Sequence, residues 1–230
     1  MPRMQLDALN NPIWSALTSA QSHFAIGGPH AKRYPAEVAP FMAVAEPSEL
    51  AGRALAELVS PGEVINIISV TPELRDGWEL LGTGNVVQMI WRTDAPVPVV
   101  DSSDIVELGA DDAPDMLALT ALVFPGYFRP RTPEMGAYFG IRQNGRFAAM
   151  TGERMKVRGL EEISAVCTHP DFTGRGYAAR LVSYVARNML QRGIRPFLHV
   201  NETNKRARDL YERVGFENRA ILPLWLLKRK

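Results

Sequence analysis

The stretch Val166-Cys-Thr-His-Pro-Asp-Phe-Thr-Gly-Arg-Gly-Tyr-Ala-Ala-Arg-Leu181 decides how the rest of the sequence is interpreted. An apolar run ends at Pro170, which cannot donate to a sheet ladder, so a strand is expected to stop there. Gly174 and Gly176 then flank Arg175, and apolar residues return at helical spacing. A strand, a glycine loop and a helix in this order turn free backbone N–H groups toward an anion. The stretch therefore predicts a cradle for a pyrophosphate group.

The loop differs from the two commonest phosphate-binding motifs. It lacks the Lys-Ser or Lys-Thr pair of a Walker loop. It also departs from the dinucleotide fingerprint, because Ala179 takes the place of the last glycine and no strand–helix repeat precedes it. A plain strand-to-helix turn is the alternative interpretation of this loop alone.

A second motif lies about 30 residues downstream of the loop. After a short strand predicted over residues 195–200, the chain reads Asn204-x-x-Ala-x-x-Leu-Tyr211-x-x-x-Gly-Phe216. Tyr211 follows Asn204 by seven residues, or two helical turns, so both side chains are expected on one face of a helix. Asn204 also suits the N-cap of that helix.

Together the two motifs resemble the GNAT superfamily of acyl-CoA-dependent N-acyltransferases. The family pattern is an (Arg/Gln)-x-x-Gly-x-(Gly/Ala) loop followed by Asn-x-x-Ala-x-x-Leu-Tyr-x-x-x-Gly-Phe. The second half matches here at every position, and the first half reads Thr173-Gly-Arg-Gly-Tyr-Ala178. Thr173 replaces the usual Arg or Gln, which leaves Arg175 as the only cation of the loop. The resemblance covers roughly residues 104–230 and is closest to the branch that includes glycine N-acyltransferases.

The resemblance implies that acetyl-CoA is the acyl donor, and no metal is expected. It assigns the pyrophosphate to the loop and the amide-bearing pantetheine arm to the backbone of the preceding strand, which the arm would join as an extra strand does. The residues implied in cofactor binding are Val166, Cys167, Thr168, Gly174, Arg175, Gly176, Tyr177, Ala178, Ala179 and Asn204. Cys167 is expected to pack against its neighbours or to contact the cofactor through its backbone. The alternative is that its thiol carries the acyl group covalently.

Three residues are predicted as catalytic: Tyr211, His199 and Glu162. An ordinary tyrosine pKa of about 10 keeps Tyr211 protonated at neutral pH, ready to donate to the leaving thiolate. Its alternative is a core tyrosine on the apolar stripe of the helix. His199 is preferred as the base because an ordinary histidine pKa of about 6.5 suits proton abstraction. Glu162 ranks second, and water alone could also serve.

The loop from Phe124 to Pro133 is expected to bound the acceptor site. It places aromatic residues beside arginines, so Tyr127 and Phe128 are predicted to contact the substrate, with core packing as the alternative. The predicted function is acetyl transfer from acetyl-CoA to the primary amine of a small molecule or amino acid, by direct attack. The alternatives are a CoA-binding sensor or interaction domain without turnover, and a nucleotide-phosphate binder.

Two parts of the chain are expected. Residues 1–100 alternate between predicted strands and helices and suit a small α/β subdomain, which by analogy could be a degenerate copy of the second part. A proline-containing connector over residues 93–103 leads to the GNAT-like part, residues 101–230. This part is predicted as a mixed, mostly antiparallel α/β (α+β) sheet flanked by helices, with an Asn144-Gly145 hairpin and a terminal hairpin bent at Pro223.

The composition of the chain limits which kinds of protein, partner and cellular location are expected. With 46% hydrophobic and 22% charged residues, the chain is typical of soluble globular proteins. A net charge of +1 gives no reason to expect nucleic acid or a charged membrane surface as a partner. One cysteine cannot form an internal disulfide, and no apolar run is long enough to span a bilayer, so a cytoplasmic location is expected. His23 and His30 have no partner at metal-ligand spacing.

Overall fold

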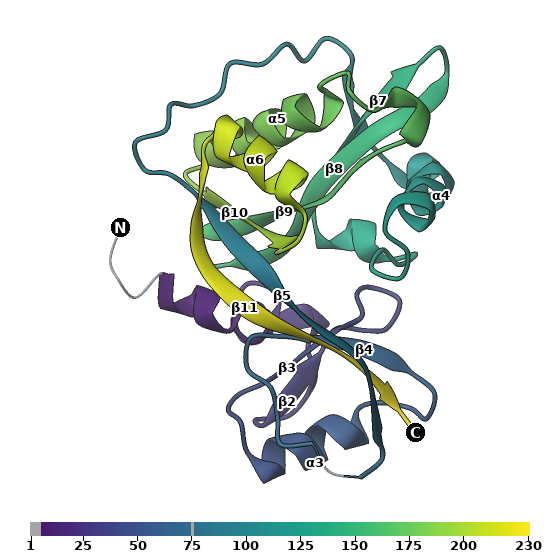
Figure 1. The fold of residues 1–230 in the computed structure, drawn as a ribbon, viewed down its shortest axis with the longest axis vertical. Coiled ribbons are helices and arrows are strands. Elements are labelled where there is room, and N and C mark those ends of the chain that lie inside the picture. Colours follow the sequence, from purple (N-terminus) through teal and green to yellow (C-terminus); the bar gives the residue numbers. More distant parts are fainter. Residues whose placement is uncertain (1–5, 75) are drawn as a thin grey trace.

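The computed structural model describes residues 6–74 and 76–230 (Figure 1). The strands are β1 Ile26–Gly27, β2 Ala31–Arg33, β3 Phe41–Val44, β4 Val64–Ile68, β5 Trp78–Trp91, β6 Ile105–Leu108, β7 Tyr138–Gln143, β8 Arg146–Val157, β9 Leu160–Thr168, β10 Arg195–Asn201 and β11 Phe216–Arg229. The α-helices are α2 Pro12–Leu17, α3 Glu49–Glu57, α4 Ala113–Val123, α5 Tyr177–Gln191 and α6 Lys205–Val214. Short 3-10 helices cover η1 Ala8–Asn10, η2 Ser22–Phe24, η3 Ala110–Asp112, η4 Thr132–Met135 and η5 Pro170–Phe172.

The strands form one 11-stranded sheet in the order β1-β2-β3-β4-β11-β5-β10-β9-β8-β7-β6. Only the β3–β4 and β9–β10 pairs are parallel, and the other neighbours are antiparallel. The prediction of a mixed, mostly antiparallel sheet with flanking helices is confirmed.

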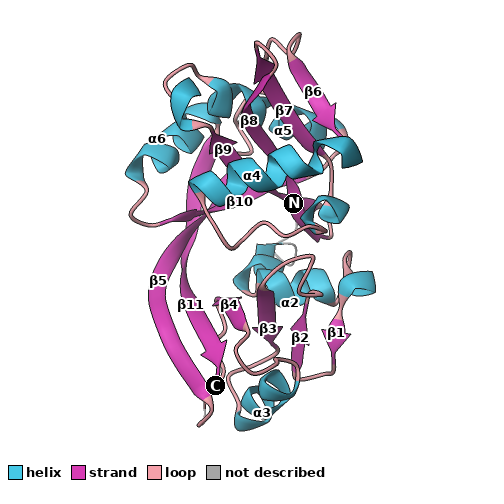
Figure 2. Ribbon diagram, turned by 90° about the vertical axis from the view of Figure 1, so that its right-hand side faces the viewer, coloured by secondary structure: helices cyan, strands magenta, loops and turns pink. Residues whose placement is uncertain are grey.

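The sheet runs across the predicted boundary at residue 100. Strand β5 precedes the boundary, yet it pairs with β10 and β11, which follow it. Strand β11 in turn pairs with β4. Figure 2 shows β5 and β11 as two long, curved strands that join the upper and lower parts of the molecule. Residues 92–104 contain neither helix nor strand, as expected for the connector.

The turn between β7 and β8 follows from two residues. Asn144 and Gly145 have φ angles of 52° and 77°, in the left-handed region that Asn and Gly tolerate best. This turn joins β7 and β8, so the hairpin predicted at Asn144-Gly145 is confirmed.

The predicted terminal hairpin at Pro223 is wrong. Strand β11 continues through Pro223, which lies opposite Asn85 of β5. The pairing of β11 with β4 begins only at Leu224, so Pro223 lies at the end of that register, where β4 requires no N–H donor from it. The carbonyl of Pro223 still accepts a hydrogen bond from the Ser69 N–H at 2.8 Å.

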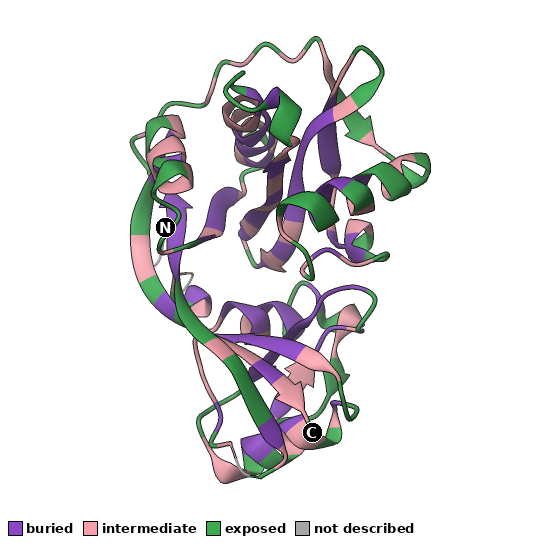
Figure 3. Ribbon diagram, turned by 45° about the vertical axis from the view of Figure 1, so that its right-hand side comes forward, coloured by how far each residue is buried: buried purple, intermediate pink, exposed green. Residues whose placement is uncertain are grey.

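Helices cover both faces of the central strands. Helices α5 and α6 pack on one face, with Leu181, Val185 and Met189 fully buried against Leu198 and neighbouring residues. Helix α4 packs on the other face and covers Met150 and Cys167, among others. Figure 3 shows this burial along the inner side of α5 and the strands beneath it. No helix in the described residues is long and apolar enough to cross a membrane.

Candidate active site

The site begins where two parallel strands separate. Strands β9 and β10 pair at only three positions, the last of which joins Glu162 to Phe197. Beyond it β10 continues along β5 to Asn201, while β9 continues along β8 to Thr168. The edge of β9 from Ile163 onward therefore has no partner strand on the β10 side. Such an edge can bind an extended, amide-bearing molecule as an additional strand.

Strand β9 is irregular at this opening. Met150 lies opposite Cys167 and Gly152 lies opposite Ser164, so one residue of β8 faces two residues of β9. This β-bulge contains Ala165, whose φ of 53° is unusual for a residue with a side chain. Strain of this kind costs on the order of 1–3 kcal/mol and is concentrated at functional sites. The bulge redirects the β9 backbone at the wall of a pocket.

The pocket occupies the opening and has a volume of about 400 Å³. Its β9 wall consists of residues 163–166, and its β10 wall consists of residues 199–201. Helix α6 contributes Ala207 and Tyr211, together with its N-cap residue Asn204. The remaining lining residues are Phe41, Ile68, Val86, Phe124, Tyr127, Arg154 and Leu224.

The glycine loop has the conformation of an anion cradle. Gly174 and Gly176 have φ angles of 80° and 78°, and Gly176 is the N-cap of the 15-residue helix α5. A Cβ at either glycine would meet no atom within 4 Å, so the left-handed backbone, not crowding, requires glycine. The first N–H groups of α5 have no partner within the helix and lie at its positive end.

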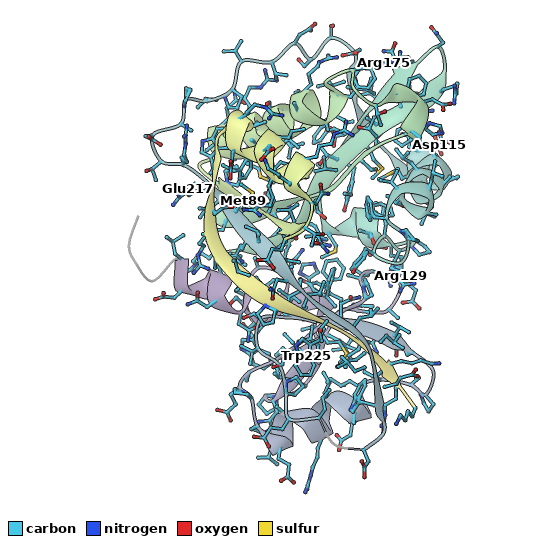
Figure 4. All side chains as sticks on the ribbon, in the orientation of Figure 1. Met89, Asp115, Arg129, Arg175, Glu217 and Trp225 are labelled. Atoms are coloured by element: carbon cyan, nitrogen blue, oxygen red, sulfur yellow. The ribbon has the colours of Figure 1, made fainter. Side chains whose placement is uncertain are left out.

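The side chains in and around the glycine loop make different contacts. Thr173 donates its hydroxyl to the carbonyl of Pro170 at 3.0 Å, so it serves the turn. The Arg175 guanidinium lies 5.1 Å from the centre of the Phe172 ring. Figure 4 shows Arg175 at the upper end of the molecule, near the start of α5. Tyr177 is buried in the core beneath α5.

Helix α6 brings the predicted pair together. Asn204 accepts a hydrogen bond from the Ala207 N–H at 3.1 Å, so it caps the helix, and it also lines the pocket. Tyr211 lines the pocket two turns further on, with its ring edge-on to Phe216. Burial raises the pKa of the Tyr211 hydroxyl, so this group is protonated throughout the neutral range.

Glu162 and His199 lie in one buried hydrogen-bonded network. Arg154 donates Nε and Nη2 to the two carboxylate oxygens of Glu162, at 2.8 and 2.7 Å. The Nδ1 atom of His199 lies 2.7 Å from Glu162 Oε1. Burial alone would raise the pKa of Glu162, but Arg154 and the His199 hydrogen bond outweigh it and lower this pKa to about 2.

Gln88 settles which nitrogen of His199 carries the proton. Its Oε1 accepts from Arg219 Nη1 at 2.8 Å, so its Nε2 must be the donor to Leu9 O and to His199 Nε2, at 3.1 and 2.9 Å. The Nε2 atom of His199 is therefore the acceptor, and its Nδ1–H donates to Glu162. Both nitrogens of the predicted base are engaged, and Glu162 is ionised and fully buried.

Comparison with known proteins settles the family. The FR47-like protein family matches residues 138–225. A solved structure from Novosphingobium aromaticivorans, assigned to the GNAT family of acetyltransferases, is 36% identical, covers 96% of this chain and 98% of that one, and has a TM-score of 0.89. The chain belongs to the GNAT family.

Two further proteins are similar to this chain, one over part of its sequence and the other in fold. An uncharacterised N-acetyltransferase of Methanocaldococcus jannaschii is 36% identical over 70 residues, which are 30% of this GNAT chain and 31% of that protein. The chain thus matches about a third of the length of that curated relative. A GCN5-related N-acetyltransferase of Kribbella flavida shares the fold, with a TM-score of 0.59 at 17% identity over 94% of this chain and 95% of that one.

The remaining predicted site residues of this GNAT protein lie in different surroundings. Tyr127 lines the pocket and stacks on Phe41, with ring centres 6.2 Å apart. Phe128 instead packs edge-on to Tyr138 in the core beneath α4 and is not among the pocket-lining residues. Cys167 belongs to the same core cluster, and burial raises the pKa of its thiol to about 12. Among the described residues, no cluster of His, Cys, Asp or Glu could hold a metal ion.

Several lining residues carried no signal that singled them out in the sequence. Phe41 and Ile68 come from the N-terminal part of the chain, far from either motif. The bulge at Ala165 could not be recognised from the sequence, because no glycine or proline stands there. Arg154 had a usable signal, because an arginine within a largely apolar strand invites the question of what pairs with it.

Proposed function

We propose that this GNAT protein transfers an acetyl group from acetyl-CoA to the primary amine of a small molecule or amino acid, by direct attack of the amine. The observation that carries the proposal is the separation of β9 from β10, with a glycine cradle at the N-terminus of α5 and Tyr211 on the pocket wall. The motif's resemblance to glycine N-acyltransferases supports including amino acids among the acceptors.

In this proposal the donor is held almost entirely by backbone. The N–H groups from Gly174 to Ala179 receive the pyrophosphate, and the positive end of α5 adds a favourable dipole. The free edge of β9 at Val166–Thr168 pairs with the amides of the pantetheine arm. Asn204, already at the mouth of the pocket, offers its amide group to the same arm.

The acyl transfer then uses two groups of the pocket wall. The amine nitrogen attacks the thioester carbonyl carbon, and a backbone N–H of β9 stabilises the negative charge that develops on the carbonyl oxygen. The tetrahedral intermediate collapses with cleavage of the C–S bond, and Tyr211 donates its hydroxyl proton to the departing sulfur. The Tyr211 phenolate then regains a proton from the attacking nitrogen, which loses its extra hydrogen as the amide forms. The proton of the ammonium group passes to water, because His199 is hydrogen bonded through one ring nitrogen to Glu162 and through the other to Gln88. The net reaction yields an amide, a thiol and one proton.

Calorimetric titration is the first test. Acetyl-CoA and CoA should bind, while ATP and NAD, which lack the pantetheine arm, should not. Thiol release in the presence of amines should then show turnover. If the CoA compounds do not bind, or if ATP and NAD bind equally well, the assignment of the cradle is wrong.

The second function is binding of CoA without turnover, as a sensor or interaction domain. Two observations favour it: Thr173 is hydrogen bonded within its own turn, and neither predicted base has a free lone pair directed at the pocket. Tight CoA binding with no thiol release from any amine would support this function over the enzyme. The cytoplasmic location and the absence of a nucleic-acid or membrane partner stay predictions.

A further inference from the structure

The charge of the acceptor pocket is the starting point. Of the 17 residues that line it in the described chain, Arg154 is the only one that carries a full charge at neutral pH, and no Asp, Glu or Lys is among them. A pocket for a diamine or a polyamine would need a carboxylate to hold the second ammonium group. The described lining contains none.

One edge of the Arg154 guanidinium binds Glu162, and a second edge remains available for another hydrogen-bond acceptor. Its Nε and Nη2 atoms bind Glu162 side-on, and the guanidinium lies 4.7 Å from the centre of the Phe41 ring. Its Nη1 has no hydrogen-bond partner in the described residues and is not one of the fully buried polar atoms without a partner. Since Arg154 lines the pocket and Glu162 does not, the edge formed by Nη1 and Nη2 is the one available to a ligand.

A planar edge of two guanidinium nitrogens matches one chemical group above others. Arginine binds carboxylates through two parallel N–H···O bonds, and the remaining N–H groups on Nη1 and Nη2 of Arg154 suit such a bidentate contact, made end-on. Glu162 restrains the guanidinium and leaves this second edge unused. The side chain is only 12% exposed, so a carboxylate bound there would be largely shielded from water.

The other walls are apolar and come from distant parts of the chain. Phe41 and Tyr127 form a stacked aromatic pair beside Arg154. Ile68, Phe124 and Leu224 also belong to the apolar lining. Walls of this kind favour an acceptor with an aliphatic or aromatic side chain.

From these observations we propose that the acceptor is an amino acid with an apolar side chain, whose carboxylate binds Arg154. This inference rests on the proposed function, since it names the acceptor class of the same site. The carboxylate on Arg154 and the side chain against Phe41 and Tyr127 leave the amino group to face the bulge of β9.

Matched substrates test the proposal with the unaltered protein. L-phenylalanine, phenethylamine and L-phenylalaninamide share a side chain, and only the first has a carboxylate. In a thiol-release assay with acetyl-CoA, kcat/KM for L-phenylalanine should exceed that of the other two by at least about 100-fold, because each analogue lacks the ion pair with Arg154. Phenylalaninamide controls for the shape of the carboxylate, and phenethylamine, whose amine is about as basic as that of phenylalanine, controls for amine basicity. Equal or faster turnover of either analogue would overturn the proposal.

Product binding separates failure of this inference from failure of the proposed function. N-acetyl-L-phenylalanine and N-acetylphenethylamine are titrated into the protein by calorimetry, which needs no turnover. Tighter binding of the carboxylate compound, by at least about 10-fold, supports the inference even if acetyl-CoA is never consumed. If thiol is released with other amines while neither phenylalanine nor its N-acetyl form binds, the acetyltransferase function is supported and the amino-acid acceptor is excluded.

A conservative variant locates the effect. Arg154→Lys keeps a cation opposite Glu162 but loses the second edge of the guanidinium. KM for L-phenylalanine should rise at least about 10-fold while KM for acetyl-CoA stays unchanged. Arg142→Lys is the matched control, since Arg142 pairs with Asp112 and Asp115 and does not line the pocket. Unchanged discrimination between phenylalanine and phenethylamine in a folded Arg154→Lys protein would contradict the assignment of Arg154.

Discussion

Tyr211 is a residue whose surroundings suit one proton transfer. It is buried, its pKa is raised above the ordinary value, and it nevertheless lines the pocket. A group with this raised pKa is protonated at neutral pH, so it holds the proton that an acid would give to the departing sulfur. Its place on the pocket wall fits the predicted acid, while its burial fits the core role that the apolar stripe of α6 also allowed, so its role stays a prediction.

The change Tyr211→Phe tests this role with little loss of packing. We expect kcat to fall by about 100-fold or more, with KM for acetyl-CoA unchanged, because only the proton donor is removed. Tyr184→Phe is the control, since Tyr184 packs on Phe139 and Arg187 and is not a pocket-lining residue. Steady-state kinetics measure both variants. Full activity of Tyr211→Phe would exclude Tyr211 as the acid.

Glu162 makes a second residue-scale prediction, on stability. Its folded pKa of about 2 lies below the unfolded value of 4.5, so its ionised form stabilises the fold above about pH 4.5, and this contribution is lost as pH falls toward 2. At pH 7, Glu162→Gln should cost about 3–5 kcal/mol of unfolding free energy, because Arg154 loses its buried partner. The difference from the unaltered protein should shrink below pH 4.5, as measured by urea unfolding.

An exposed ion pair provides the control for Glu162. Glu134 pairs with Arg131 at the surface, where 46% and 49% of the side chains are exposed. Glu134→Gln should therefore change stability little at any pH. A difference between Glu162→Gln and the unaltered protein that persists unchanged to pH 3 would show that loss of packing, not of charge, is its cause.

Strand alternation and motif spacing found His199 and Glu162 but not their roles. Each was placed on its strand from the sequence. In the structure they are hydrogen bonded to each other, and Arg154 of β8 binds Glu162 while Gln88 of β5 binds His199. Strand β5 ends at Trp91 and β10 begins only at Arg195, and pairing over such a separation is not encoded in local periodicity. Whether a histidine has a free nitrogen depends on such distant partners, so its role as a base could not be judged from the sequence.

At the scale of elements, the cradle depends on backbone conformation at the start of α5. Gly176 and Gly193 stand at the two ends of this helix, with φ angles of 78° and 73° and open space around both. Gly176→Asp should weaken acetyl-CoA binding at least 100-fold, since it adds bulk and negative charge where a pyrophosphate is expected. Gly193→Asp imposes the same backbone strain at the other end and should bind acetyl-CoA normally. Calorimetry measures both, and equal loss of binding would place the cofactor elsewhere.

Elements with strong local signals were predicted well. The Asn-Gly turn, the glycine loop and the N-cap at Asn204 each depend on a few adjacent residues, and each was located correctly. The bulge at Ala165 was not, because its left-handed conformation is imposed by pairing with β8. The start of β5 at Trp78 also has no clear local signal, since Gly82 and Gly84 interrupt the strand pattern.

For the whole molecule, one continuous sheet predicts one unfolding event. The N-terminal strands reach the rest of the sheet through β11, whose pairing with β5 extends from Phe216 to Arg229. Amide hydrogens of β3 and β4 should therefore exchange through the same opening, with the same free energy, as those of β8 and β9. Hydrogen-exchange mass spectrometry at several urea concentrations measures this. Earlier opening of residues 41–68 alone would show that this part unfolds as a separate unit.

The position of β11 also constrains how the chain can reach its native state. Strand β11 lies between β4 and β5 in the sheet, although both of those strands are synthesised more than 120 residues before it. Until residues 216–229 leave the ribosome, both earlier strands present unpaired edges, which are sites where nascent chains associate wrongly. We therefore expect the sheet to close slowly for a protein of this size, only after residues 216–229 have emerged, and chaperones to matter most in that interval.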